Sequence, residues 1–218
     1  MLRYPCLVLD HDDTVVKSES TVNYPYFCKF LDQFRPGTCI TLQEYTEGCY
    51  TPGFTEMCRQ KYHFTQKELE EEYKGWMAYV STHIPAYFPG IERIIRRQKQ
   101  EGGIICVVSH SSQINIRRDY MTHFHIVPDE IYGWELPPSQ RKPSPYPLYQ
   151  IMAHHHVSPE EILVVDDMKP ALQMCRAAGV PIGFAAWSHL ENPVILQEMS
   201  QSCDYTFRCP AELEAFLF

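Results

Sequence analysis

The sequence predicts an α/β fold, in which a parallel sheet carries helices on both faces and an all-helical segment is inserted after the first strand. Short apolar runs that suit buried parallel strands occur at 6–9, 103–108 and 162–165. Helix patterns alternate with strand patterns in the second half of the chain, as β-α-β units require. The stretch 19–88 contains helix starts but no strong strand pattern. Together these observations describe a Rossmann-like core with a helical insertion.

Composition fits a folded chain and excludes several classes of function. The 218 residues are 44% hydrophobic, which is enough for a buried core, and the formal net charge is -8 at pH 7. Nucleic-acid backbones attract clustered Lys and Arg, so this acidic balance predicts no nucleic-acid partner. The nine cysteines include no Cys-x-x-Cys pair, which favours free thiols. No signal peptide opens the chain and no apolar run approaches the roughly 20 residues of a membrane span, so we expect a cytoplasmic protein without a membrane partner.

The inserted segment is expected to be a bundle of helices. Thr41-Leu-Gln-Glu44 and Thr65-Gln-Lys-Glu68 both have the form of a capping box, which marks the start of a helix. The second box opens a helix expected over 65–81. Phe88-Pro89-Gly90 is a turn that returns the chain to the α/β pattern.

After this turn, helices and strands are expected to alternate to the end of the sheet. A Pro-rich loop at 137–145 contains Lys142, and Gly179 closes the last helix of the series. The expected helices cover 91–100, 113–122, 146–155 and 169–178, and the expected strands cover 103–108, 130–132, 162–165 and 180–185.

Pairs of carboxylates follow two of the expected strands. Asp10 and Asp12 follow the first apolar run two residues apart, so in extended backbone they point the same way. Asp166 and Asp167 follow the run at 162–165, where two adjacent acids are costly to bury without a cation. Such carboxylates suit Mg²⁺, which prefers hard oxygen ligands. Because ligand sites form at the carboxyl ends of parallel strands, we expect a metal-assisted site at this edge.

Three further polar residues are expected at the same edge of the sheet. Ser109 follows the strand at 103–108 and, with the N–H groups of a helix start, can donate hydrogen bonds to phosphate oxygens. His110 lies beside it and is expected to line the site. Lys142 would add a compact positive charge against the same phosphate. The whole set predicts a phosphoryl-transfer site.

The residues and their order resemble the haloacid dehalogenase-like superfamily. The segment between Ser109 and Lys142 is too short for one of the family's two large cap types, so the resemblance implies the helical C1-type cap. It implies a core domain at 1–18 and 88–218 and a cap domain at 19–87. The matching segments are 8–14 (VLDHDDT), 107–109 (VVS), 141–145 (RKPSP) and 164–167 (VVDD).

The resemblance also implies a role for each residue. Asp10 would attack phosphorus to give an aspartyl-phosphate, while Asp12 would protonate the leaving oxygen and then activate water. Ser109 and Lys142 would hold the transferred phosphoryl group. The implied Mg²⁺ ligands are the carboxylates of Asp10 and Asp167, the backbone carbonyl of Asp12, and Asp166 in or near the coordination shell.

Three positions depart from the family's common pattern. Asp13 and Asp166 stand where Gly is frequent, and Ala171 stands where many members carry a further acid. The metal site is therefore expected to depend on Asp166 and Asp167.

The favoured function is hydrolysis of a small-molecule phosphate monoester, in the branch that resembles phosphoglycolate phosphatase and β-phosphoglucomutase. Asp12 argues against dehalogenation, because a leaving halide needs no proton. Three alternatives stay open: phosphoryl transfer like that of β-phosphoglucomutase, phosphonate hydrolysis, and non-catalytic binding of a phosphorylated ligand. The sequence indicates neither the physiological substrate nor the oligomeric state.

Overall fold

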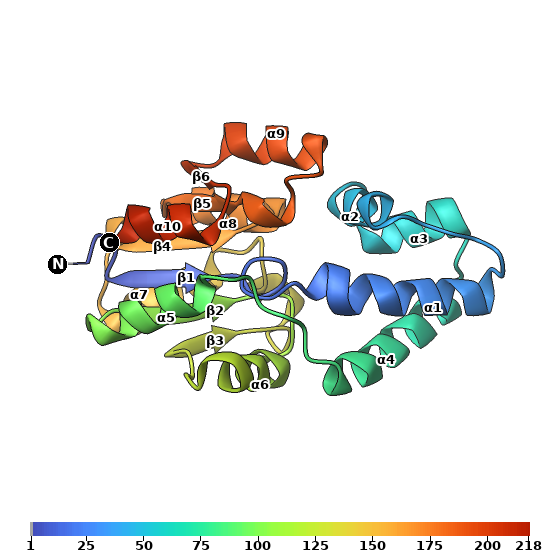
Figure 1. Cartoon of the computed structure of the whole chain (residues 1–218), viewed down its shortest axis with the longest axis horizontal. Helices are drawn as coiled ribbons and strands as arrows, with labels where there is room; N and C mark the ends of the chain where they lie inside the picture. The colour runs from blue at the N-terminus through green and yellow to red at the C-terminus, as the bar shows by residue number, and fades with distance from the viewer. Residues whose placement is uncertain (1) are drawn as a thin grey trace.

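The core of the protein is a parallel sheet, which confirms the predicted fold class. The computed structural model describes residues 2–218. Six strands pair in parallel in the order β3-β2-β1-β4-β5-β6 (Figure 1). The strands are β1 (Cys6–Leu9), β2 (Ile104–Val108), β3 (Glu130–Tyr132), β4 (Ile162–Asp166), β5 (Ile182–Ala185) and β6 (Tyr205–Phe207).

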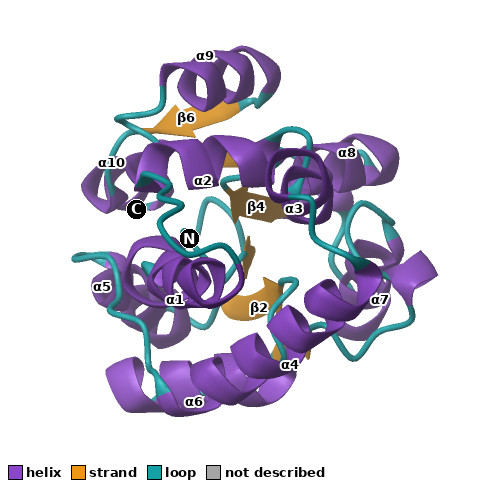
Figure 2. Ribbon diagram, turned by 90° about the vertical axis from the view of Figure 1, so that its right-hand side faces the viewer, coloured by secondary structure: helices purple, strands orange, loops and turns teal. Residues whose placement is uncertain are grey.

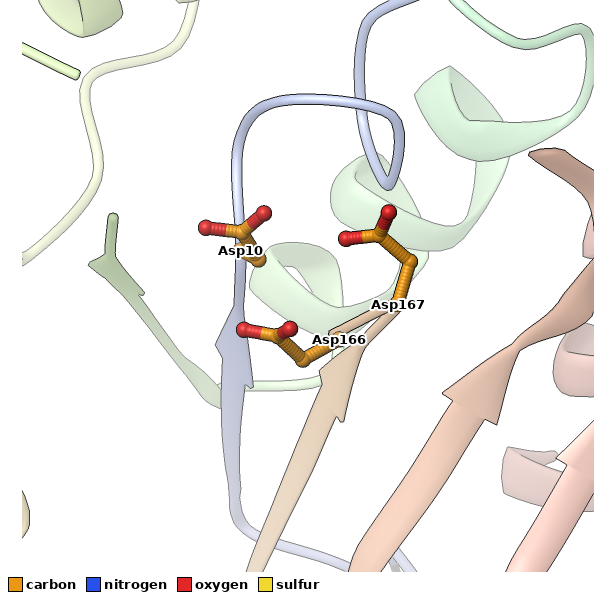
Figure 3. A group of neighbouring side chains, drawn as sticks. All are labelled: Asp10, Asp166 and Asp167. Atoms are coloured by element: carbon orange, nitrogen blue, oxygen red, sulfur yellow. The ribbon is translucent and has the colours of Figure 1, made fainter. Parts of the chain in front are cut away.

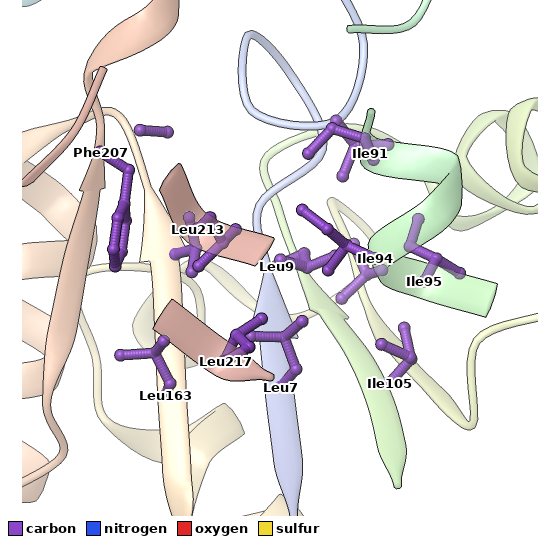
Figure 4. Packing of buried hydrophobic residues seen from close by; sticks show 14 of the residues in the cluster. Leu7, Leu9, Ile91, Ile94, Ile95, Ile105, Leu163, Phe207, Leu213 and Leu217 are labelled. Carbon is purple, nitrogen blue, oxygen red and sulfur yellow. The ribbon is translucent and has the colours of Figure 1, made fainter. Parts of the chain in front are cut away.

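Helices cover both faces of the sheet, because successive side chains of a strand point to opposite faces and each face is apolar. These helices are α5 (Ile91–Gln100), α6 (Gln113–Phe124), α7 (Tyr146–His155), α8 (Lys169–Ala178) and α10 (Pro210–Leu217). Leu7 and Leu9 of β1 pack against α5, α6 and α10, and Figure 4 shows Ile94 of α5 beside them. Cys6 and Val8 pack on the opposite face against α7 and α8. The central strand is therefore buried on both sides.

The inserted segment is helical, as predicted, and lies beyond the carboxyl ends of the strands (Figure 1). It consists of the π-helical turn η1 (Glu19–Asn23) and helices α1 (Tyr24–Phe34), α2 (Leu42–Tyr50), α3 (Phe54–Tyr62) and α4 (Gln66–Thr82). Both capping boxes are formed, at Thr41 with Glu44 and at Thr65 with Glu68. An aromatic core of its own holds the segment together, with Phe27 at its centre. Figure 2 views the molecule from this side, with the four helices in front of the strands.

Helices α5, α7 and α8 have the predicted bounds, and three strand bounds differ. The strand β2 begins at Ile104 rather than Gly103. The strand β4 continues through Asp166, so this acid belongs to the sheet rather than to the loop after it. The strand β5 begins at Ile182 rather than Val180, because the N–H of Val180 still donates to Cys175 O across the end of α8. Gly179 makes that turn possible, since its φ of 69° is in the left-handed region.

The chain after β5 carries elements that the sequence analysis did not predict. Besides β6 and α10 these are the short turn η4 (Ala186–Ser188) and the helix α9 (Pro193–Ser202). Ile195 and Met199 of α9 pack with Phe184 of β5 and with Tyr50 at the end of α2, so α9 joins the sheet to the inserted helices. Two further short helical turns are η2 (Pro138–Gln140) and η3 (Pro159–Glu161). None of the helices in residues 2–218 combines the length and apolar character needed to cross a membrane.

The strand β1 marks the point where the order of the sheet reverses. From β1 the chain order runs outward through β2 and β3 on one side and through β4, β5 and β6 on the other. Loops that leave adjacent strands in opposite directions open a crevice at such a point, and ligands bind there. Asp10, Ser109 and Asp167 follow β1, β2 and β4, so the topology brings them to one place.

Candidate active site

Lys142 holds two carboxylates at the centre of this edge of the sheet. Its Nζ donates to Asp10 Oδ1 at 2.8 Å and to Asp166 Oδ2 at 2.7 Å. All three side chains are buried. The N–H of Asp10 donates to Val165 O at 2.9 Å, so the pairing of β1 with β4 continues past the strand and fixes the Asp10 backbone. The Pro-rich loop therefore places its lysine between these two carboxylates.

Asp167 completes a cluster of three buried carboxylates, which Figure 3 shows at the ends of β1 and β4. One oxygen from each of Asp10, Asp166 and Asp167 lies within 4.8 Å of the other two. Asp167 Oδ2 lies 2.8 Å from His189 Nε2, and Asp166 Oδ1 accepts a hydrogen bond from the N–H of Met168 at 2.9 Å. The three predicted carboxylate ligands are thus brought together.

Burial controls the electrostatics of this cluster. Desolvation raises the pKa of Asp166 to about 8, although the Lys142 ammonium acts in the other direction. Desolvation also raises the pKa of Asp167, opposed by its hydrogen bond to His189. Burial alone would lower the pKa of Lys142, but the charges of Asp10 and Asp166 outweigh it and raise that pKa. Three carboxylates therefore share one fixed cation, and an oxygen donor set of this kind fits a divalent ion such as Mg²⁺.

Asp12 turns its carboxylate toward two serines that follow β2. Asp12 Oδ2 accepts hydrogen bonds from Ser111 Oγ at 2.5 Å and from Ser109 Oγ at 3.4 Å. The next residue, Asp13, has a φ of 51°, and its Oδ1 accepts a hydrogen bond from the N–H of Glu19 at 3.1 Å. Asp tolerates this left-handed backbone better than most residues. The tight turn lets Asp10 and Asp12 face one space while they contact different partners.

Most of the predicted residues line one cavity of about 260 Å³. Asp166, which is 1% exposed, does not line it and reaches the site through Lys142. The predicted residues on the cavity wall are Asp10, Asp12, Ser109, His110, Lys142 and Asp167.

His110, which was predicted to line the site, contacts both the backbone of Lys142 and the ring of Trp134. Its Nε2 lies 3.1 Å from the carbonyl oxygen of Lys142 and therefore donates to it. Its ring meets Trp134 at a near-perpendicular angle, with 6.1 Å between the ring centroids. Desolvation and the Lys142 charge lower the pKa of His110. A neutral imidazole is thus held beside the cavity.

Three residues of the site were not found from the sequence: His189, Glu19 and Glu72. His189 follows β5 through η4 and is 2% exposed. The sequence could have indicated His189, because it follows β5, and this parallel strand ends at the same edge of the sheet as β1, β2 and β4. Glu19 and Glu72 come from the inserted helices, where nothing in the local sequence separates them from surface acids.

Glu19 and Glu72 line a second cavity of about 500 Å³ that adjoins the first. The residues on the walls of both cavities are Asp12, Glu19, Asn23, Cys49 and His110. Burial raises the pKa of Glu72 to about 7, and it also raises the pKa of Glu19 to about 7. Two further carboxylates therefore lie close to the predicted phosphoryl-transfer site.

The chain belongs to the haloacid dehalogenase-like hydrolase family, which matches residues 7–185. The match runs from β1 to the end of β5 and includes every residue of the three-carboxylate cluster. This confirms the resemblance that the four sequence motifs indicated, and the protein is a hydrolase of this family. None of the curated proteins matches the sequence.

Solved structures show the same fold over almost the whole chain. A protein from Haemophilus somnus, described as a predicted phosphoglycolate phosphatase, has 16% identity and a TM-score of 0.76, with 99% of each chain covered. CbbY from Rhodobacter sphaeroides, in complex with xylulose-(1,5)bisphosphate, has 17% identity and a TM-score of 0.71, with 96% of each chain covered. A haloacid dehalogenase-like protein from Agrobacterium tumefaciens has 17% identity and a TM-score of 0.78, covering 98% of this chain and 97% of the other. The likeness therefore includes the inserted helices as well as the sheet.

Replacing Lys142 by Met should strongly destabilise the metal-free protein, because Asp10 and Asp166 would stay buried without their cation. Breaking a buried ion pair by removing one partner typically costs about 3–5 kcal/mol. Urea unfolding in the presence of EDTA measures this change. Lys67→Met is the matched control, since the Lys67 side chain is 86% exposed and its pair with Glu71 is long, at 3.9 Å. Equal losses of stability in the two variants would contradict the assigned ion pairs.

Replacing Glu72 by Gln should stabilise the protein more at high pH than at low pH. The pKa of Glu72 rises from 4.5 to about 7 on burial, so the folded protein holds this proton more tightly than the unfolded chain does. Stability is therefore lost as the pH rises from 4.5 to about 7, and Gln removes that loss. We expect thermal melts to show a gain on the order of 2 kcal/mol near pH 8 and little gain near pH 5. Glu71→Gln, at an exposed neighbour, should show no such trend, and a pH-independent difference for Glu72→Gln would rule out this explanation.

Proposed function

We propose that this protein is a Mg²⁺-dependent phosphatase that hydrolyses a small-molecule phosphate monoester through an aspartyl-phosphate at Asp10. The observation that carries the proposal is the geometry around Lys142, whose Nζ lies 2.8 Å from Asp10 Oδ1 in a cavity that Asp12 also lines. A nucleophile, an acid–base group and a cation for the phosphate thus face one space.

In the first step, a carboxylate oxygen of Asp10 attacks phosphorus and the bond from phosphorus to the ester oxygen breaks. Lys142 and Ser109 hold the phosphoryl oxygens by charge-assisted and neutral hydrogen bonds. The Asp12 carboxyl gives its proton to the departing oxygen, so a neutral alcohol leaves. The hydrogen bond from Ser111 Oγ, at 2.5 Å, orients Asp12 for this transfer.

In the second step, a water molecule attacks phosphorus and gives a proton to the Asp12 carboxylate. The bond from phosphorus to the Asp10 oxygen then breaks and inorganic phosphate leaves. Asp10 ends as a carboxylate and Asp12 as a carboxylic acid, as at the start. Water takes part only in this step, so the enzyme must admit it after the alcohol has left.

The residues that would hold Mg²⁺ are Asp10, Asp167, the carbonyl of Asp12, and Asp166 in or near the coordination shell. When bound, the ion neutralises charge that develops on the phosphoryl oxygens in the transition state. His189 orients Asp167 through the 2.8 Å contact of its Nε2. Lys142 keeps Asp10 apart from Asp166 by pairing with one oxygen of each.

We assign residues 1–18 and 88–218 to the core domain and residues 19–87 to a cap domain. The cap residues Glu19, Asn23 and Cys49 line the same cavity as Asp10 and Lys142. A cap in this position closes over the substrate and excludes water from the first step. It also contacts the part of the substrate that differs from one phosphate ester to another, so substrate choice belongs to the cap.

Two of the similar structures support a small phosphorylated substrate. The Rhodobacter sphaeroides protein holds xylulose-(1,5)bisphosphate, and the Haemophilus somnus protein is described as a predicted phosphoglycolate phosphatase. Xylulose-(1,5)bisphosphate and phosphoglycolate are both small phosphate esters. They are useful members of a test panel for this protein.

Replacing Asp10 by Asn should abolish turnover, because the amide cannot attack phosphorus. Phosphate release from a panel of phosphomonoesters, with Mg²⁺ or with EDTA, should depend on the metal and should fall at least about a thousandfold in Asp10→Asn. Asp32→Asn, at an exposed acid of α1, is the control and should keep full activity. Metal-independent release, or release that survives in Asp10→Asn, would contradict the proposal. Phosphoryl transfer to a second hydroxyl without phosphate release would favour a mutase instead.

A further inference from the structure

The larger cavity is a candidate binding site for the leaving group of the ester. It has a volume of about 500 Å³ and lies between the inserted helices and the loops of the core. Asp12, the proposed proton donor to the leaving oxygen, lies on the walls of both cavities. An ester whose phosphate contacts Lys142 therefore directs its alcohol portion past Asp12 into this space. The chemistry of the wall indicates which alcohol fits.

Glu72 is an unpaired acid on this wall. The residue is 6% exposed, and its carboxylate makes no hydrogen bond or ion pair with any of residues 2–218. Its backbone carbonyl, by contrast, accepts a hydrogen bond from Tyr26 at 3.0 Å. A buried carboxylate without a partner costs free energy in the free protein. The Glu72 carboxylate therefore destabilises the folded protein unless a ligand pairs with it.

Glu19 places a second carboxylate on the same wall. Its Oε1 accepts a hydrogen bond from Asn23 Nδ2 at 3.1 Å, while its Oε2 is buried and has no hydrogen-bond partner among residues 2–218. Asn23 Oδ1 in turn accepts a hydrogen bond from Trp76 Nε1 at 2.9 Å. This chain of contacts fixes both the acid and the indole on the wall.

The residues that line this cavity include no Lys and no Arg. His110 is the one basic side chain among them, and desolvation lowers its pKa, so it adds no charge near neutral pH. Lys142 lies on the wall of the adjoining cavity, where it pairs with Asp10 and Asp166. The Arg141 guanidinium carbon stacks on the Trp134 ring, 3.8 Å from the ring centroid. Arg59 and Lys74 line a separate surface depression beyond Tyr73. Arg59 already pairs with Glu56 at 2.8 Å. An anionic leaving group would therefore meet two carboxylates, and no lysine or arginine on the wall of this cavity would offset them.

Aromatic rings complete the wall. Tyr73 lies 6.1 Å from Trp76 and 6.4 Å from Trp134, measured between ring centroids. All three rings line the cavity, two from α4 and one from the loop after β3. Aromatic faces together with carboxylates attract organic cations, since the ring quadrupole and the negative charge act in the same direction. An uncharged group on the same wall would gain no such charge attraction.

We propose that the substrate is the phosphate monoester of an alcohol that carries an amine or quaternary ammonium group, with the cation bound between Glu72, Glu19 and the aromatic rings. This inference rests on the proposed phosphatase function and adds the class of the leaving group. The phosphate and the cation lie at opposite ends of the substrate. Lys142 pairs with the first and the cap carboxylates pair with the second.

A series of esters that differ in charge but little in size tests the proposal. Aminoethyl phosphate, hydroxyethyl phosphate and phosphoglycolate share the phosphate and place an amine, a hydroxyl or a carboxylate at the same distance. Glucosamine 6-phosphate, glucose 6-phosphate and 6-phosphogluconate repeat the comparison with a larger leaving group. We expect kcat/KM to be at least about tenfold higher for the amine than for the hydroxyl in one or both series, and lowest for the carboxylate.

Two variants test whether Glu72 and Glu19 cause the preference for the amine ester. Glu72→Gln and Glu19→Gln should each reduce the ratio of kcat/KM for the amine ester to that for the hydroxyl ester by at least about tenfold. Glu71→Gln, the next residue on α4 but exposed, should leave this ratio unchanged. Circular dichroism and thermal melts check the fold, and the near-equal size of Gln keeps the packing.

The outcomes separate the two proposals. Metal-dependent hydrolysis that Asp10→Asn abolishes, but with no preference for the amine, would overturn the inference and leave the phosphatase function standing. A preference that survives in both Gln variants would also overturn it, because the cation would then bind elsewhere. Hydrolysis of no ester in either series would count against the phosphatase function and against this inference with it.

Discussion

The ion pairs of Lys142 with Asp10 and Asp166 are the interaction on which the rest of the site depends. Nζ lies 2.8 Å from one carboxylate and 2.7 Å from the other, and all three groups are buried. Desolvating two acids is tolerable only because this ammonium is fixed between them. Asp167 then adds a third carboxylate, which one lysine cannot offset. The excess negative charge is what makes the cluster suitable for a divalent cation, and it arises because the ends of the adjacent strands β1 and β4 meet at one edge of the sheet.

The two ends of the site are proposed to bind opposite charges of the substrate, and each end belongs to a different part of the chain. The core supplies Lys142 and the groups expected to hold phosphate and metal. The inserted helices supply Glu19 and Glu72, which line the larger cavity beside aromatic rings. A reaction common to a whole family can thus be combined with a substrate preference that is particular to one chain. Changing the charge of the inserted helices changes which alcohol fits without changing how phosphorus is attacked.

The site residues of the core could be predicted from the sequence because a residue that directly follows a parallel strand lies at a known edge of the sheet. Asp10, Ser109 and Asp167 each follow an apolar run, so the parallel sheet places them together once the strands are identified. The elements after Ala185 were missed because no predicted strand or site residue led to them, and His189 was missed with them. Glu72 illustrates a different limit, since burial on one side of α4 depends on how that helix packs against the other inserted helices. Its neighbour Glu71 has the same chemistry and is exposed.

Calorimetric titration of the protein with Mg²⁺ tests the central claim, that the three-carboxylate cluster is a metal site. We expect saturable binding of one ion per chain, with an affinity at least about tenfold lower in Asp167→Asn. Asp32→Asn should bind Mg²⁺ as the unmodified protein does. Absence of saturable binding, or an unchanged affinity in Asp167→Asn, would contradict the account, because the buried charge would then be balanced in some other way.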